Sequence, residues 1–99
     1  MILFRIFILV LLPLICLSQN TYSLATLKYN GGGDWYANPT ALPNLIEFSN
    51  NNIGTNIKKS PEIVEVGSSD IFNYPFVHMT GHGNIFFSNE EANNLRKYL

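Results

Sequence analysis

The sequence predicts an α/β fold with three layers, in which helices cover a mostly parallel sheet. Two observations predict it. Short β-branched or aromatic segments alternate with helical repeats along residues 22–99, and polar turns separate them. One later segment is apolar on both faces, which is typical of a parallel strand covered on both sides.

The first element is expected to be a strand at residues 22–29. This segment is rich in Tyr, Thr and Leu, and the triple glycine at residues 31–33 follows it closely. Glycine tolerates backbone angles that other residues avoid, so the strand should run into a loop with an unusual path. The loop continues to Asn38.

A helix is expected between Thr40 and Gly54. Thr40 is placed to cap its start, Pro43 is tolerated in the first turn and Gly54 is placed to end it. The positions at helical spacing on its predicted apolar face are Leu42, Leu45, Ile46, Ser49 and Ile53.

Two further strands are expected after this helix. Residues 63–66 are short and β-branched, which suits the second strand. Residues 67–73 should connect it to the third, with one helical turn at residues 70–72. Residues 75–80 predict a third strand at the centre of the sheet, apolar except for His78 and Thr80.

A last helix is expected from Ser88 to Leu99. Ser88 and Glu91 have the spacing of a capping box, in which each side chain bonds the other residue's backbone amide. Basic residues in the last turn complement the helix dipole. The predicted buried stripe is Ala92, Leu95 and Leu99.

Two segments carry a resemblance to a known family. They are residues 27–48, LKYNGGGDWYANPTALPNLIEF, and residues 74–99, YPFVHMTGHGNIFFSNEEANNLRKYL. Both closely resemble the bacterial family called domain of unknown function 4159, which is similar to the class I glutamine amidotransferase-like superfamily. The resemblance implies a flavodoxin-like or glutamine amidotransferase-like architecture. It implies a fold rather than a reaction, because the activity of the family is not established.

The resemblance also implies a domain roughly twice as long as residues 19–99. In the family, the helix corresponding to residues 88–99 is followed by a double glycine and a further strand that leads to acidic residues. Residues 19–99 are therefore expected to be the N-terminal half of such a domain, and the fold is expected to be truncated.

Residues 1–18 are expected to be a secretory signal peptide. Arg5 precedes an apolar run at residues 6–17, and small or polar residues follow. A membrane-spanning helix needs about 20 apolar residues, and this run is shorter and has Pro13 near its middle. Lipid attachment at Cys16 is a weaker alternative, because the residues before it are not small. The protein is thus expected to be periplasmic or extracellular, without a stable membrane span after cleavage.

The mature chain would have no cysteine and a small negative charge. Cys16 is the single cysteine, so residues 19–99 hold no disulfide, cysteine-ligated zinc or cysteine nucleophile. Five Lys and Arg stand against seven Asp and Glu there, a formal charge of −2. Nucleic-acid binding is disfavoured, because it needs a basic surface. No cofactor is expected, because residues 31–33 belong to neither a P-loop nor a dinucleotide-binding motif.

Two loops follow predicted parallel strands and should lie at one edge of the sheet, where α/β proteins bind ligands. The predicted ligand-binding residues are Gly32, Gly33, Asp34, Trp35, Tyr36, Gly81, His82 and Gly83. A carboxylate beside two aromatic rings suits polar ligands such as sugars. In the alternative interpretation the glycines only permit tight turns, the rings cover the sheet edge and Asp34 caps a turn.

The two histidines have different expected roles. His78 lies in a strand and is expected to be a satisfied core residue. His82 lies between two glycines at a strand end and is a candidate ligand donor, general acid or general base. His82 and Asp34 are the candidates for catalysis, and two ligands alone predict no metal site.

Three functions remain open from the sequence. The first is a non-catalytic module that binds a polar ligand or a protein partner at the strand-end loops. The second is a hydrolase that uses His82 and Asp34 together with acidic residues outside this chain. The third is a truncated, inactive fragment.

Overall fold

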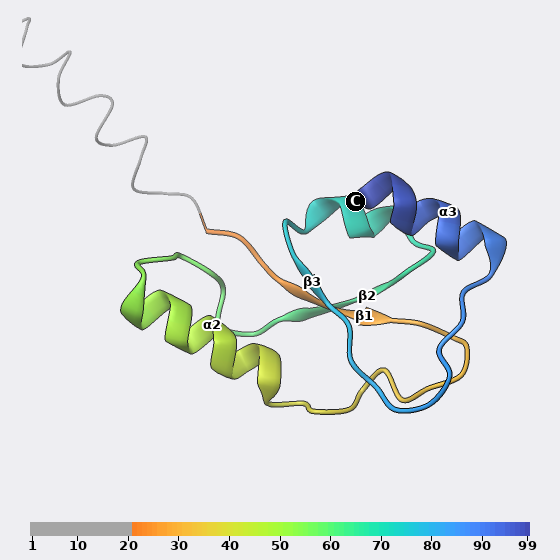
Figure 1. Cartoon of the computed structure of the whole chain (residues 1–99). Coiled ribbons are helices and arrows are strands. Elements are labelled where there is room, and N and C mark those ends of the chain that lie inside the picture. The colour runs from red at the N-terminus through yellow and green to blue at the C-terminus, as the bar shows by residue number, and fades with distance from the viewer. Residues whose placement is uncertain (1–20) are drawn as a thin grey trace, which may run out of the picture.

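The computed structural model describes residues 21–99, so the predicted signal peptide at residues 1–18 lies outside the described residues. Three strands form a parallel sheet in the order β2–β1–β3 (Figure 1). The strands are β1 (Ala25–Lys28), β2 (Glu62–Glu65) and β3 (Val77–His78). The helices are α2 (Ala41–Asn52), the 3-10 helix η1 (Ser69–Asn73) and α3 (Asn89–Tyr98). The predicted α/β fold with a parallel sheet is confirmed.

Side chains alternate between the two faces of β1, and each face packs on different helices. The buried cluster toward η1 and α3 is Ala25, Leu27, Tyr29, Val64, Val66 and Ile71. The buried cluster toward α2 is Leu24, Leu42, Ile46 and Ile57. Figure 1 shows α2 on one side of the sheet and the η1–α3 pair on the other. The sheet is therefore the middle of three layers.

The third predicted strand is shorter than expected and lies at an edge. The sequence predicts a central strand at residues 75–80, but only Val77–His78 pairs, and β1 is the central strand. Phe76 and Met79 are 45% and 48% exposed. Apolar residues on both faces indicate covering layers, but they carry no information about which strands lie on either side. The predicted helical turn before this strand is confirmed as η1.

The predicted helix after the first loop is confirmed as α2, but its cap and apolar face differ from the expectation. The Thr40 side chain makes no capping hydrogen bond, because its backbone has already turned helical (φ −95°, ψ −8°). The buried positions of α2 are Leu42, Ile46 and Ser49. Leu45 and Ile53 are 44% and 69% exposed, so the buried face is narrower than predicted. Gly54 adopts a φ of 72° just after the helix, as a helix-ending glycine does.

The capping box of α3 is confirmed. Ser88 Oγ accepts a hydrogen bond from Glu91 N at 3.1 Å, and Glu91 Oε1 accepts one from Ser88 N at 2.9 Å. The predicted burial of Leu99 is wrong, because this side chain is 91% exposed. Tyr98 packs against the core instead and donates a hydrogen bond to Tyr74 O at 2.8 Å.

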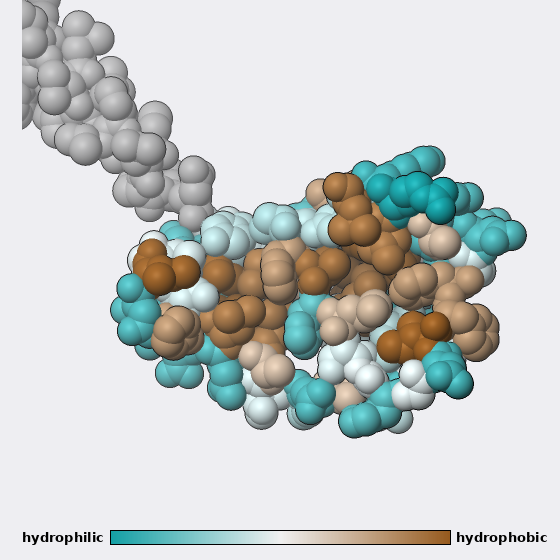
Figure 2. Space-filling view, in the orientation of Figure 1, coloured by the Kyte–Doolittle hydropathy of each residue, from teal (hydrophilic) through white to brown (hydrophobic). Residues whose placement is uncertain are grey.

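An apolar groove lies at the amino ends of β1 and β3, with a volume of about 720 Å³. We call it the amino-end groove. The residues that line it are Tyr22, Leu24, Leu45, Ser49, Ile57, Phe72, Asn73, Tyr74, Pro75 and Phe76. Figure 2 shows hydrophobic surface across the middle of the molecule, between α2 and the η1–α3 pair. Within residues 21–99, no helix has the length and apolar character needed to cross a membrane.

Candidate functional site

The strand order creates a switch point between β1 and β3. The chain leaves β1 through α2 to reach β2 on one side, and then returns through η1 to β3 on the other side of β1. In open parallel sheets the loops diverge at such a point and leave a crevice at the carboxyl ends of the strands. Both predicted ligand-binding loops lie there: residues 29–39 follow β1 and residues 79–87 follow β3.

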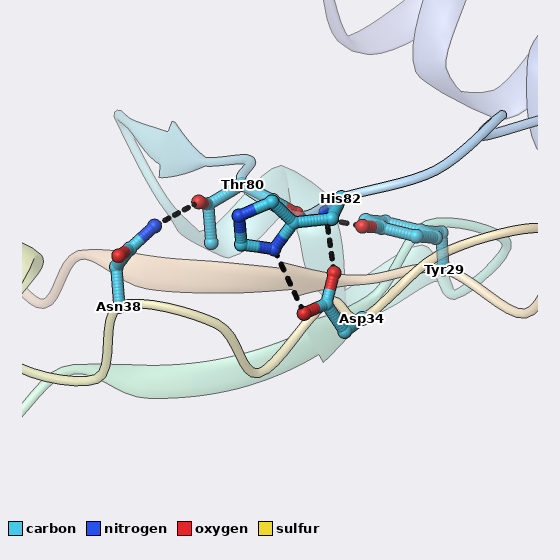
Figure 3. Close-up of polar contacts among 5 residues, drawn as sticks. All are labelled: Tyr29, Asp34, Asn38, Thr80 and His82. Carbon is cyan, nitrogen blue, oxygen red and sulfur yellow. Dashed lines mark hydrogen bonds and ion pairs between the residues drawn. The ribbon is translucent and has the colours of Figure 1, made fainter.

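Asp34 and His82 meet across this switch point (Figure 3). The His82 backbone amide donates a hydrogen bond to Asp34 Oδ1, and His82 Nδ1 lies 3.1 Å from Asp34 Oδ2. The two residues are 48 positions apart in sequence, so only the side-by-side strands bring them together. The expectation that they share one rim of the sheet is confirmed.

The contact between Asp34 and His82 lowers the pKa of the Asp34 carboxyl group and orients the His82 imidazole. The hydrogen bond from the His82 backbone amide, and then that from the His82 ring, hold the pKa of Asp34 below its usual value, while partial burial opposes them. The side chain of His82 is 84% exposed and that of Asp34 is 32% exposed. Because Nδ1 faces Asp34, Nε2 is the nitrogen that faces away from the pair.

A second set of hydrogen bonds fastens the same two loops together. The buried Tyr29 hydroxyl donates to Thr80 O at 2.7 Å, and Asn38 Nδ2 donates to Thr80 Oγ1 at 2.9 Å (Figure 3). Burial, and then the charge of Asp34, raise the pKa of Tyr29. These three residues and the Asp34–His82 pair form what we call the loop latch. Sequence reasoning missed Tyr29, Asn38 and Thr80 as members of this site.

Asn38 carried a weak sequence signal for its role. It adopts a φ of 54°, and asparagine is one of the few residues that tolerate this left-handed region. An asparagine directly before a proline in a glycine-rich loop is consistent with such a turn. The contacts of Tyr29 and Thr80 had no local signal, because 51 positions separate the two residues.

The glycines of both loops allow backbone to pack against backbone. A Cβ atom at Gly81 would overlap the Tyr29 hydroxyl, and one at Gly32 would overlap Asn84 O. Gly31 and Phe86 form an antiparallel bridge between the loops. Close loop packing therefore accounts for these glycines, as the structural alternative expects. Ligand binding by Gly32, Gly33, Gly81 and Gly83 stays a prediction.

Trp35 and Tyr36 have different surroundings. Trp35 is half-buried and packs against the cluster toward α3, with Lys28 Nζ 5.4 Å from its ring centroid. Tyr36 is 67% exposed and meets Trp35 edge to face at 5.7 Å. Trp35 thus covers the sheet edge, as the structural alternative expects, whereas Asp34 bonds to His82. Both rings also line a cavity beside the loop latch.

His78 is not the satisfied core histidine that the sequence predicts. It lies on the edge strand β3 and is half-buried. Its Nε2 is buried, yet it has no hydrogen-bond partner among residues 21–99. The strand pattern located His78 correctly but could not show whether a partner lies within reach. Among the same residues, no three His, Cys, Asp or Glu side chains gather as a metal site.

Comparison with known protein families gives a match over most of the chain. The profile of a family described as Domain of unknown function (DUF4159) matches residues 23–99, which include every strand and α-helix of the described residues and both loops of the latch. No curated protein and no solved structure matches the chain.

Proposed function

The chain belongs to the family described as Domain of unknown function (DUF4159), and we propose that it is a non-catalytic binding domain. It holds a polar ligand at the loops that follow β1 and β3. One observation carries this proposal: Asp34 orients the exposed His82 ring at the switch point of the sheet, with Nε2 facing away from the pair.

The geometry separates an orienting residue from a contacting residue. Both carboxylate oxygens of Asp34 already accept hydrogen bonds from His82, so Asp34 acts on a ligand through His82. His82 Nε2 can donate or accept a hydrogen bond, depending on its protonation state. Tyr36 supplies an exposed aromatic ring on the neighbouring loop. Together they suit a ligand with hydroxyl, amide or carboxyl groups.

The loop latch supports binding because it holds both loops in place before a ligand arrives. A ligand site that is already formed avoids the entropic cost of ordering loops on binding. Tyr29 and Asn38, from the first loop, both bond to Thr80 in the second. These contacts hold the loop that carries Tyr36 against the loop that carries His82.

We further propose that the domain works outside the cytoplasm. The sequence pattern of residues 1–18, with one basic residue before an apolar run, supports export. A cysteine-free mature chain is compatible with an oxidising compartment, because it has no thiol to oxidise. Fractionation of cells that produce the full chain tests this proposal: recovery of uncleaved protein in the cytoplasm would contradict it.

Histidine NMR signals test the binding proposal. The purified full chain would be mixed with four sets of probes: free amino acids, glucose with N-acetylglucosamine, citrate, and inorganic phosphate. We expect one set to shift the Cε1–H signal of His82, and His82→Ala to weaken its binding at least fivefold. Lys58→Ala, on the α2–β2 connection, is a matched surface control that should leave binding unchanged. No shift with any set would count against the proposal.

A hydrolase is the second candidate, and the same pair favours it. A carboxylate that holds Nδ1 of a histidine leaves Nε2 able to take a proton from water or from a hydroxyl nucleophile. The test is hydrolysis of p-nitrophenyl esters, phosphates and glycosides by the full chain, followed across pH. Turnover that His82→Ala abolishes, or bound metal that this variant loses, would favour the hydrolase over the binding domain.

A further inference from the structure

A cavity of about 270 Å³ lies beside the loop latch, on the side of the sheet that faces α2. Its floor is one row of side chains across the three strands. Thr26 pairs with Ile63 on one side and with His78 on the other, so all three point to the same face. Among the described residues, α2 contributes only Leu42 to the lining of this cavity, and Ile63 is 60% exposed. The carboxyl half of this face is therefore open.

The walls of the cavity come from the loop after β1. Trp35 and Tyr36 stand edge to face there, with ring planes at 87°. Pro39 and Pro61 add rigid apolar surface. Flat aromatic and proline surfaces contact the face of a ring well, because they lose little conformational freedom on binding.

Most polar groups around the cavity are short and neutral. Thr26, Asn38, His78 and Thr80 line it, and Glu62 is the single charged residue of the lining. Among residues 21–99, no lysine or arginine lines it. Lys28, whose Nζ lies 5.4 Å from the Trp35 ring centroid, is also 4.0 Å from Glu65 Oε1, so a carboxylate already faces this cation. The lining thus selects a neutral ligand with hydrogen-bonding groups on its edge.

His78 has a buried ring nitrogen that a ligand could hydrogen-bond. A buried polar nitrogen without a partner lowers the stability of the folded protein. Its Nε2 has none in the described part of the chain, and His78 is one of the residues that line the cavity. Because this nitrogen is buried, the half-buried ring would have to rotate to present it to a hydroxyl group in the cavity.

We propose that this cavity binds one neutral sugar ring, with its face on the Trp35–Tyr36 wall and a hydroxyl bonded to His78 Nε2. The inference rests on the proposed binding function and gives it a ligand class. A cavity below the roughly 300–1,000 Å³ of pockets for drug-sized ligands accommodates one ring rather than a chain. His82 would contact the part of the ligand that extends beyond the cavity.

Trp35 reports binding directly, because it is the only tryptophan in the chain. The full chain would be titrated with glucose, galactose, mannose and N-acetylglucosamine, followed by its fluorescence and by saturation-transfer NMR. We expect at least one sugar to change the fluorescence. Inositol isomers have ring hydroxyls but no ring oxygen. Comparing their affinity with that of the sugars tests whether the site requires the ring oxygen.

Two substitutions of His78 separate a binding role from a structural one. His78→Leu should weaken sugar binding roughly five- to tenfold, the effect of one lost hydrogen bond. It should also raise the melting temperature, because the unpartnered buried nitrogen is gone. His78→Gln should retain most of the affinity. The matched control is Met79→Leu, next along the chain and 48% exposed, which should change neither quantity.

The outcomes distinguish this inference from the proposed function. Unchanged sugar binding by His78→Leu, a lower melting temperature of that variant, or no sugar binding by the wild type would overturn the sugar site. If amino acids, citrate or phosphate still shift the His82 signal, the binding function stands without it. If no probe shifts that signal either, both proposals fail.

Discussion

The two ends of the parallel sheet are held together in different ways. At the carboxyl end, the loop latch joins residues 29–39 to residues 79–87 through directional hydrogen bonds and close backbone contacts. At the amino end, the amino-end groove is bounded by mostly apolar side chains, with no Asp, Glu, His, Lys or Arg in its lining. Polar contacts thus join the loops at the carboxyl end, whereas mainly apolar side chains line the groove at the amino end.

This difference shows where the fold can support recognition. Hydrogen bonds depend steeply on distance and angle, so a latched pair of loops holds its side chains in one arrangement. Apolar contacts are non-directional and tolerate side chains of similar size. A ligand that must be oriented is therefore expected at the carboxyl end, and the substitution with the largest effect should also lie there.

The largest expected effect is at Gly81. Gly81→Ala would place a Cβ atom onto the Tyr29 hydroxyl, at a φ of 141° that alanine avoids. The latch would have to open to accommodate it, and we expect unfolding in urea to show a loss of about 3 kcal/mol. The binding of any ligand at His82 should be lost with it.

Gly54→Ala provides the matched control at the amino end. Gly54 also has a positive φ, 72°, but a Cβ atom there would meet nothing within 4 Å. Only backbone strain would remain, so the loss should be about 1 kcal/mol. Equal losses for the two substitutions would show that the carboxyl end is not the more tightly specified end.

The second prediction measures how much the directional bonds outside the carboxyl end contribute to stability. Asn50, in the last turn of α2, makes three hydrogen bonds with the loop that leads to β2. Its Nδ2 donates to Ile57 O, and its Oδ1 accepts from Thr55 Oγ1 and Ile57 N. Asn50→Ala should therefore lower the free energy of unfolding by about 2 kcal/mol.

Asn38→Gly is the comparison within the latch. Glycine keeps the positive φ and removes the one hydrogen bond to Thr80, so the loss should be about 1 kcal/mol. Both values come from urea unfolding of the full chain. A smaller loss for Asn50→Ala than for Asn38→Gly would mean that the α2–β2 loop needs no polar anchor.

The same contrast explains how much of the fold could be predicted from the sequence. The capping box of α3 was predictable because Ser88 and Glu91 act over three residues. The edge position of β3 was not, because it depends on which strands pair with it across the sheet. The predicted side-chain cap at Thr40 was wrong because the backbone of Thr40 is already helical, one residue before the expected start of the helix.

The sequence likewise predicted part of the candidate site and missed the rest. Parallel strands bring their carboxyl ends to one edge, so the meeting of Asp34 and His82 could be expected. The hydrogen bond from Tyr29 to Thr80 could not, because a buried tyrosine at a strand end looks like any core residue. The unpartnered Nε2 of His78 was also beyond reach, because the absence of a partner is a property of the packed structure.

The pH dependence of stability gives the smallest effect and the sharpest test of the latch. The native pKa of Asp34 lies below its unfolded value, so the pair stabilises the fold above about pH 4. This contribution is lost as the pH falls through the lowered native pKa.

Urea unfolding at several pH values should therefore show wild type and Asp34→Asn converging as the pH falls below about 4. His82→Ala should retain much of the wild-type pH dependence, because the backbone amide of residue 82 is the larger cause of the lowered pKa and survives the substitution. If His82→Ala instead abolished the pH dependence, the imidazole rather than the backbone would hold Asp34. The latch would then be a side-chain ion pair, which salt should weaken.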